Sequence, residues 1–338
     1  MRVFCLLASI CLAVTGASTR ASAYSALYVF GDSLSDVGNV YLGSGGTIPG
    51  APYANGRFSN GPNWVDDLSA KLGLGAARPA FIGGTDFAFG GAVTGPAVPG
   101  PSPVPNLSQQ VGLFSLVTGG VAPSSALYTV WMGANDIYNA LDDLAAHTLT
   151  LSQALADVKA AAQSTAASVG TLASEGAESF LIPLVPDLGV TPDVTDTAVL
   201  VPVATALSAA YNAALVAAIQ ATTASDADVF VHYLDTFLLT DEAVNDPAAF
   251  GLTDATHRCY VGPLTGGGSV CATPDTYLFW DGQHPTATGH ALLAEYAAAA
   301  IPEPPALAAF LVAWFGLLAI RLRSRAGVRA TRRARSAA

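Results

Sequence analysis

The chain has 338 residues, of which 51% are hydrophobic and 12% charged, and its formal net charge is −11. Between residues 24 and 302, however, only five basic residues stand against 24 acidic ones, which gives this stretch a formal charge of −19. So acidic a domain repels phosphate backbones and anionic membrane surfaces, and this excludes nucleic acid as an expected partner.

The first 23 residues are typical of a secretory signal peptide. Arg2 precedes an apolar stretch over residues 3–14, and Ala21-Ser22-Ala23 is a small-x-small cleavage pattern. We therefore expect export across the inner membrane, with cleavage by signal peptidase after Ala23.

Residues 24–300 alternate short apolar runs with longer helical patterns. The apolar runs end at glycine or proline, which indicates buried strands, whereas the alanine-rich segments are typical of helices. This alternation predicts one α/β domain, a three-layer α/β/α sandwich around a parallel sheet of about five strands. The expected strands are 26–30, 85–89, 126–132, 179–185 and 228–233, and the expected helices are 64–72 with Asn63 as its cap, 151–173, 201–221 and 286–300.

Two cysteines remain in the domain once the signal peptide is removed. Cys259 and Cys271 flank the glycine-rich stretch 262–270. An exported location permits a disulfide between them. Two thiols do not complete a tetrahedral zinc shell, so we expect a disulfide and no metal at this position.

The C-terminal residues 301–338 carry a second set of targeting features. Ile301-Pro302-Glu303-Pro304 precedes a charge-free run over 306–320, and seven arginines follow between residues 321 and 335. As a helix the run spans about 22 Å, less than a hydrocarbon core of about 30 Å, and the arginines orient the domain outward. The combination resembles the PEP-CTERM sorting signal, which implies a transient membrane anchor cut by an exosortase-type protease. A plain C-terminal transmembrane helix is the alternative.

Ser33 follows the first expected strand within the run Phe-Gly-Asp-Ser-Leu-Ser-Asp. A serine nucleophile needs a base, and the base needs a group that holds its tautomer. His284 is the candidate base, because Asp281 lies three residues earlier and Pro285 fixes the turn before a helix. The remaining histidines are interpreted as structural or solvated: His147, His232, His257 and His290.

Two further segments follow expected strands and offer hydrogen-bond donors. Gly90-Gly91 permits close approach of backbone N–H groups, and Asn135 carries a side-chain amide. The carboxyl ends of parallel strands meet at one edge of the sheet, so Ser33, Gly91 and Asn135 are expected there together. Taken singly, each is also explained by an ordinary turn or a helix cap.

In this order the segments resemble the GDSL lipase/esterase family of SGNH hydrolases. Four blocks carry the resemblance, which covers about residues 26–300, and the segment 181–189 also resembles the family. It implies a flavodoxin-like SGNH hydrolase fold. The blocks are Phe30-Gly31-Asp32-Ser33-Leu34-Ser35-Asp36-Val37-Gly38-Asn39, Asp86-Phe87-Ala88-Phe89-Gly90-Gly91-Ala92, Gly133-Ala134-Asn135-Asp136 and Asp281-Gly282-Gln283-His284-Pro285-Thr286.

The resemblance implies a role for each matched residue. Ser33 corresponds to the nucleophile, His284 to the general base and then acid, and Asp281 to the orienting carboxylate. The oxyanion hole corresponds to the backbone N–H of Ser33, the backbone N–H of Gly91 and the side-chain amide of Asn135. Asp86 stands where many family members have asparagine.

Two further acids lie beside the matched residues. Asp32 and Asp136 invite comparison with the triad acid, but we interpret them as residues that hold the two turns.

Other chemistries lack their motifs. The chain contains no G-x-S-x-G, no G-x-G-x-x-G, no G-x-x-x-x-G-K and no H-E-x-x-H. We therefore expect no cofactor, and hydrolysis through an acyl-enzyme on Ser33. The expected partner is an ester, which leaves lipids, short-chain esters and acetylated glycans open, with an apolar acyl site near loops 43–61 and 95–105. The alternative is a non-catalytic surface or matrix module that keeps the hydrolase fold.

Overall fold

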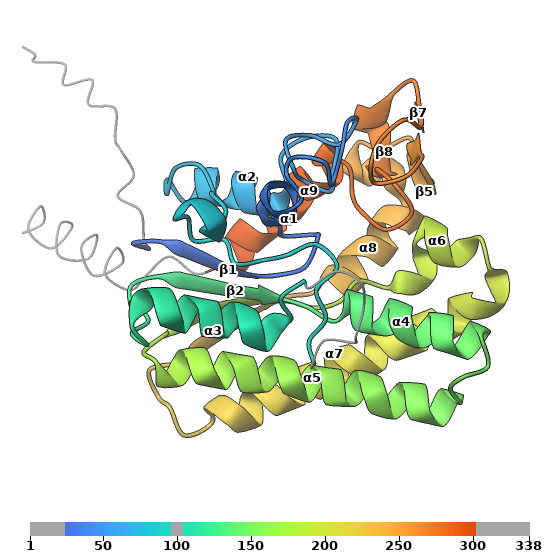
Figure 1. The fold of residues 1–338 in the computed structure, drawn as a ribbon. Helices are drawn as coiled ribbons and strands as arrows, with labels where there is room; N and C mark the ends of the chain where they lie inside the picture. Colours follow the sequence, from blue (N-terminus) through green and yellow to red (C-terminus); the bar gives the residue numbers. More distant parts are fainter. Residues whose placement is uncertain (1–23, 96–103, 302–338) are drawn as a thin grey trace, which may run out of the picture.

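The computed structural model describes residues 24–95 and 104–301. The predicted signal peptide, most of the proline-rich loop and the sorting signal beyond Ile301 lie outside the described residues. Within them, the predicted α/β/α sandwich is confirmed (Figure 1).

The central sheet is parallel, and its four strands lie in the order β1-β2-β3-β4. Each strand matches one of the apolar runs predicted from the sequence. For β1, β2 and β3 the reason is that a strand buried on both faces needs apolar residues at successive positions, whereas β4 at the edge of the sheet is partly exposed. The strands are β1 Leu27–Gly31, β2 Leu127–Trp131, β3 Ser179–Pro183 and β4 Phe230–Leu234.

The fifth expected strand, 85–89, is wrong as a regular strand. Its backbone runs beside β1, with hydrogen bonds from Val29 N to Thr85 O (3.0 Å), from Phe87 N to Val29 O (2.7 Å) and from Phe89 N to Gly31 O (3.1 Å). It forms only isolated bridges, from Asp86 to Val29 of β1 on one side and from Asp86 to Pro79 on the other. The buried carboxylate of Asp86 accepts hydrogen bonds from the backbone N–H groups of Val37 and Ala88, in place of a regular ladder on this side.

Residues 85–89 lie on one side of β1 and β2 lies on the other, so the order in which the chain adds strands reverses at β1. When this segment is counted as a strand, the spatial order is segment 85–89, β1, β2, β3, β4, which is the order of a flavodoxin-like sheet. The chain leaves β1 in one direction to form this segment and returns in the other to form β2. Ligands of such sheets bind at this switch point, beyond the carboxyl ends of the strands.

Helices cover both faces of the sheet. Figure 1 shows α2 and α9 on one side and α3, α5 and α7 on the other. The predicted cap of α2 is confirmed, because Asn63 accepts hydrogen bonds from two N–H groups of the first turn. The sequence did not predict five helices: α1, α3, α4, α6 and α8. The helices are α1 Asn39–Gly43, α2 Trp64–Lys71, α3 Leu107–Thr118, α4 Ala134–Ala145, α5 Leu151–Ser174, α6 Pro192–Thr195, α7 Val201–Thr223, α8 Thr236–Asn245 and α9 Ala287–Ala300.

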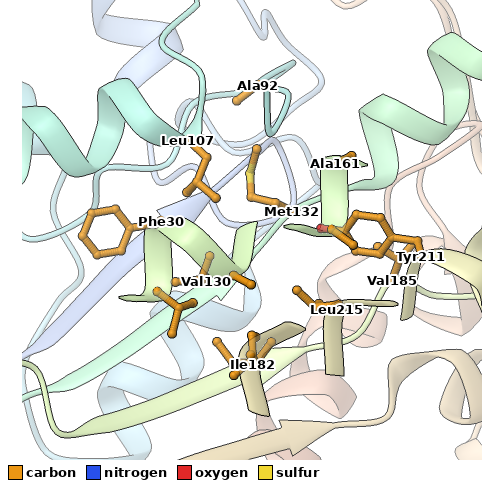
Figure 2. Close-up of a cluster of buried hydrophobic side chains, with 14 of the residues drawn as sticks. Phe30, Ala92, Leu107, Val130, Met132, Ala161, Ile182, Val185, Tyr211 and Leu215 are labelled. Carbon is orange, nitrogen blue, oxygen red and sulfur yellow. The ribbon is translucent and has the colours of Figure 1, made fainter. Parts of the chain in front are cut away.

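Two apolar clusters fill the spaces between the layers. Alternate residues of β1 point to opposite faces, so Phe30 joins the cluster under α3, α5 and α7, while Val29 joins the one under α2 and α9. Figure 2 shows the first cluster, with Phe30 and Leu107 near one end and Tyr211 near the other. These clusters hold the strand ends in place, and with them the turns that follow.

One helix among the described residues, Ala198–Thr223, is long and apolar enough to cross a membrane by length and composition. In the structure α7 packs along α5, and Thr165 of α5 and Tyr211 of α7 join their hydroxyl groups at 2.9 Å. A core helix meets the same criterion of length and composition, so the finding is weak evidence of a span.

A small β region follows α8. Its strands are β5 Asp254–Arg258, β6 Tyr260–Val261, β7 Ser269–Val270 and β8 Tyr277–Phe279. Cys259 and Cys271 form a disulfide here in the structure, and the glycine-rich stretch between them makes the β6–β7 hairpin. β8 leads directly into the segment that carries Asp281 and His284.

Candidate active site

Ser33 lies in a tight turn directly beyond β1. The turn is held by the N–H of Leu34, which donates to the Asp32 carboxylate at 3.0 Å, and by the N–H groups of Ser35 and Asp36, which donate to the Asp32 carbonyl. Burial raises the pKa of Asp32 to about 6, although the Leu34 hydrogen bond and the charge of His284 oppose this rise. Asp32 therefore acts on the backbone of the turn, as predicted, and makes no side-chain hydrogen bond to His284 in the described structure.

Asp36 ties the serine turn to the glycine pair. Its carboxylate accepts the N–H of Gly38 (2.7 Å), of Asn39 (2.6 Å) and, through Oδ2, of Gly90 (3.0 Å). Burial raises its pKa to about 6 despite these hydrogen bonds. Two segments 54 residues apart are thereby held side by side at the carboxyl edge of the sheet.

The structure brings Ser33, His284 and Asp281 into one hydrogen-bonded chain. His284 Nε2 lies 2.7 Å from Ser33 Oγ, across 251 residues of sequence. His284 Nδ1 lies 2.9 Å from Oδ1 and 2.8 Å from Oδ2 of Asp281. Nδ1 therefore carries the proton that faces the carboxylate, and Nε2 is free to accept a proton from the serine hydroxyl.

The electrostatics of the pair suit a base. Burial tends to lower the pKa of His284, but the Asp281 carboxylate outweighs it, and the pKa is raised. Burial tends to raise the pKa of Asp281, but the charge and hydrogen bond of His284 lower it to about 2. Asp281 is thus ionised at any pH at which His284 can gain a proton.

The glycine pair and Asn135 form a second group beside the serine. Gly91 has a φ of 81°, the left-handed region that favours glycine. At Gly90 a Cβ atom would lie 2.3 Å from the Phe58 ring, so this position also requires glycine. Asn135 lies in the first turn of α4, and its side-chain amide donates to the carbonyl of Ala92 at 2.9 Å.

Asp136 holds the segment that follows the glycine pair. Its carboxylate accepts the N–H and hydroxyl groups of Thr94, at 3.1 Å and 2.8 Å for the shorter contacts. Burial raises the pKa of Asp136 to about 6. The structure therefore joins the segments of Gly91 and Asn135 to each other through side chain-to-backbone bonds, and places Asp136 away from His284 in this network.

Two residues contact the triad, and no sequence motif predicts these contacts. The hydroxyl of Tyr53 donates to Asp281 Oδ2 at 2.6 Å, across 228 residues. The ring of Phe58 packs on the imidazole of His284, with centroids 5.4 Å apart. Both residues belong to the loop 43–61, whose aromatic content was visible in the sequence but whose partner was not.

A cavity adjoins the serine. Ser33, Asn135 and His284 line it, and α8, β8 and α9 supply about half of its apolar wall. No residue of the loop 43–61 or of the described part of 95–105 lines this cavity, but Tyr53 lines a second one beside Asp281 and His284, so the acyl site expected near these loops stays a prediction. Tyr53 packs against Tyr260 and Trp280.

The other histidines lie apart from the serine. His290 is buried in α9, where burial lowers its pKa to about 3, and His257 is exposed and paired with Asp254. Over residues 24–95 and 104–301, no group of three or more His, Cys, Asp or Glu side chains could hold a metal ion.

A parallel α/β sheet with a Ser–His–Asp chain at its carboxyl edge is an arrangement found in hydrolases that act by acyl transfer. Within that class, the family model described as GDSL-like Lipase/Acylhydrolase matches residues 27–297. The chain therefore belongs to the GDSL family and is a carboxylic ester hydrolase.

Several characterised proteins are similar in sequence. The chain is 28% identical to a phosphatidylcholine-sterol acyltransferase of Aeromonas hydrophila, over 87% of this chain and 95% of that protein. It is 30% identical to the esterase EstA of Pseudomonas aeruginosa, over 89% of this chain but only 50% of that protein.

Solved structures are similar at lower identity. They include LAE5, a hydrolase from the metagenome of Lake Arreo, with 15% identity, coverage of 82% of this chain and 94% of that one, and a TM-score of 0.44. The acetylxylan esterase Axe2 of Geobacillus stearothermophilus has 14% identity, coverage of 80% and 91%, and a TM-score of 0.42.

Proposed function

We propose that this protein is an exported esterase that works through an acyl-enzyme on Ser33. The observation that carries the proposal is the hydrogen-bonded chain from Ser33 Oγ through His284 to Asp281. As the oxygen of Ser33 bonds to the ester carbonyl carbon, its proton passes to His284 Nε2. That proton then goes to the alkoxide as its bond to carbon breaks. Water, deprotonated by His284, next attacks the acyl carbon and releases the acid and the serine.

The oxyanion that forms in both steps needs donors already in place. We assign this role to the backbone N–H groups of Ser33 and Gly91 and to the side-chain amide of Asn135. Two observations support the assignment: Asn135 and Ser33 line one cavity, and the left-handed Gly91 lies beside Ala92, which Asn135 holds. Asn135 Nδ2 has a second hydrogen beyond the one given to Ala92, and it remains for the substrate.

The test of the nucleophile is Ser33→Ala, measured by the turnover of a short-chain nitrophenyl ester. Hydrolysis is expected to fall by at least about 10³-fold. Ser35→Ala is the matched control, because Ser35 lies in the same turn but its hydroxyl accepts the indole N–H of Trp64 instead of facing His284. Activity of Ser33→Ala within tenfold of the parent would overturn the assignment.

A fluorophosphonate probe separates this function from that of a non-catalytic binding module. Only a serine activated by a base reacts covalently with such a probe. We expect the parent and Ser35→Ala to be labelled and Ser33→Ala to remain unlabelled. A folded parent that takes up no label supports the binding module.

For the chain as a whole we propose three parts: a signal peptide over residues 1–23, the hydrolase domain over 24–300 and a sorting signal over 301–338. Support comes from the cleavage pattern at Ala23, the Pro302-Glu303-Pro304 motif and the arginine cluster. The product would be secreted or held at the cell surface or in extracellular matrix. Intact-mass measurement of the protein from its host checks both cleavages, and a mature chain that retains residues 306–320 favours the plain anchor.

A further inference from the structure

The cavity beside Ser33 continues well beyond the reacting groups. A second set of lining residues comes from elements that carry no part of the triad. They are Leu239 and Ala243 of α8, Phe250 of the turn after it, Leu278 of β8, and Leu292 and Leu293 of α9. Except for the small Ala243, these are large apolar side chains, and none of the six is polar. The cavity thus runs from a polar end at the serine to an apolar end between α8 and α9.

The apolar end is open because small residues face it. Ala243 and Gly289 both line the cavity, and at Ala243 a larger side chain would fill the space between α8 and α9. Gly289 is also held close to Leu278 and Pro285, since a Cβ there would lie 2.9 Å from Pro285 Cβ. Figure 1 shows α8 and β8 beyond the ends of β1 and β2, so this wall stands over the site itself.

We propose that this cavity binds the acyl chain of the substrate, and that the enzyme prefers esters of aliphatic acids well beyond acetate in length. The inference rests on the proposed acyl-enzyme and names the substrate class for it. After the first step the acyl group stays bonded to Ser33 Oγ, whereas the alcohol must leave and water must enter. Because the acyl group stays, the apolar cavity can hold it, whereas the alcohol occupies the open side of the site.

The size of the preference follows from burial. Each methylene that moves from water into an apolar site favours the bound state by an amount worth about fourfold in kcat/KM. The wild-type protein is therefore expected to show kcat/KM rising by about fourfold per added methylene from acetate through butyrate and hexanoate to octanoate. Nitrophenyl esters, each kept below the concentration at which it aggregates, provide the series.

Two variants test the wall. Ala243→Phe and Thr240→Phe each place a ring from α8 into the cavity, and each should lower the ratio of kcat/KM for octanoate to that for acetate by at least tenfold. Leu238→Phe is the matched control, because Leu238 lies on the same helix, is 52% exposed and does not line the cavity. Its ratio should equal that of the parent. Thermal melting confirms that each variant is folded, and the wild-type series stands even if one variant is not.

The possible outcomes distinguish a failure of the acyl-cavity inference from a failure of the proposed esterase function. A flat acyl series, or a ratio unchanged in both folded phenylalanine variants, overturns the acyl cavity while leaving an active esterase. A series of acetate esters with longer alcohols that rises in place of the acyl series assigns the cavity to the alcohol, and also overturns it. Absence of hydrolysis and of fluorophosphonate labelling across the whole series overturns the proposed function instead.

Discussion

Tyr53→Phe removes one hydroxyl group from the far side of the proposed triad. The Asp281 carboxylate accepts from Tyr53, from the N–H groups of Gln283 and His284, and from His284 Nδ1. Tyr53 and His284 share Oδ2, at 2.6 Å and 2.8 Å. The Tyr53 hydroxyl therefore lowers the basicity of the oxygen that faces the imidazole, and its loss should strengthen the pairing of Asp281 with protonated His284.

The magnitude follows from the worth of that hydrogen bond. A hydrogen bond to a charged group contributes about 1.5–3 kcal/mol. We assume that half of this free energy acts on the protonated imidazole of His284, since three N–H donors to Asp281 remain in the variant. At 1.36 kcal/mol per pKa unit, the acid limb of the profile of kcat/KM against pH should then move up by about half to one unit.

The sign is set by the role of His284 as a base. His284 must be neutral to accept the serine proton, so activity is lost as the pH falls through its raised pKa. Tyr53→Phe should lose about threefold to tenfold in kcat/KM on the acid limb and little on the plateau. The phenyl ring keeps the contacts with Tyr260 and Trp280.

The assay is hydrolysis of a short-chain nitrophenyl ester followed from the acid limb to the plateau. Tyr128→Phe is the control, because its hydroxyl donates to the carbonyl of Pro123 at 2.9 Å and makes no contact with the triad. Tyr128→Phe is expected to lower the melting temperature without moving the limb. A Tyr53→Phe profile that coincides with the parent, or moves to lower pH, refutes the reasoning.

Two further substitutions test other parts of the site. Asn135→Ala should lower kcat by about 10²-fold or more with the fold intact, because it removes a donor whose bond to the substrate strengthens as the oxyanion develops. Asp86→Asn should gain stability relative to the parent as the pH rises from 4 to 8. Burial, and then the nearby Asp36, raise the pKa of Asp86 well above its usual value, so the native parent holds protons that the unfolded chain has released, and loses stability across this range.

The readouts for these two variants are steady-state kinetics and thermal melting across pH. Each kcal/mol of relieved cost corresponds to roughly 2–4 °C in melting temperature for a domain of this size. An unchanged kcat in Asn135→Ala would show that Asn135 serves only to hold Ala92. A difference in melting temperature between Asp86→Asn and the parent that stays constant from pH 4 to 8 contradicts the proposed cost of burying Asp86.

Local sequence predicted much of the fold because the responsible forces are local. β1 and β2 are apolar runs followed closely by glycine, and α2 begins at Asn63, whose side chain forms a capping box with Asp66. The segment 85–89 was misread as a regular strand because its apolar pattern is real, while the contacts that disrupt it are not local. Asp86 bonds to Val37, 49 residues away, and no periodicity shows this.

The residues of the site likewise divide into those that the sequence predicted and those that only the structure reveals. Ser33 and the Asp281–His284 pair were visible in the sequence because each sits in a short motif with its own turn chemistry. Tyr53 was not, since its partner is 228 residues distant. The cavity beside Ser33 was not predicted either, because aromatic composition does not say which wall a side chain joins, and its wall includes α8, a helix that the sequence did not predict.

By itself, then, the sequence determined which groups do the chemistry: a serine, a histidine with its carboxylate, and candidate oxyanion donors, all in one acidic domain. Only the tertiary structure decided how they meet and what they face. Parallel strands bring the turns after β1 and β2 to one edge, and the small β region that contains β8 places residue 284 within hydrogen-bond reach of residue 33. The cavity exists only where α8, β8 and α9 converge around small residues, and such convergence is a property of packing that no single segment encodes.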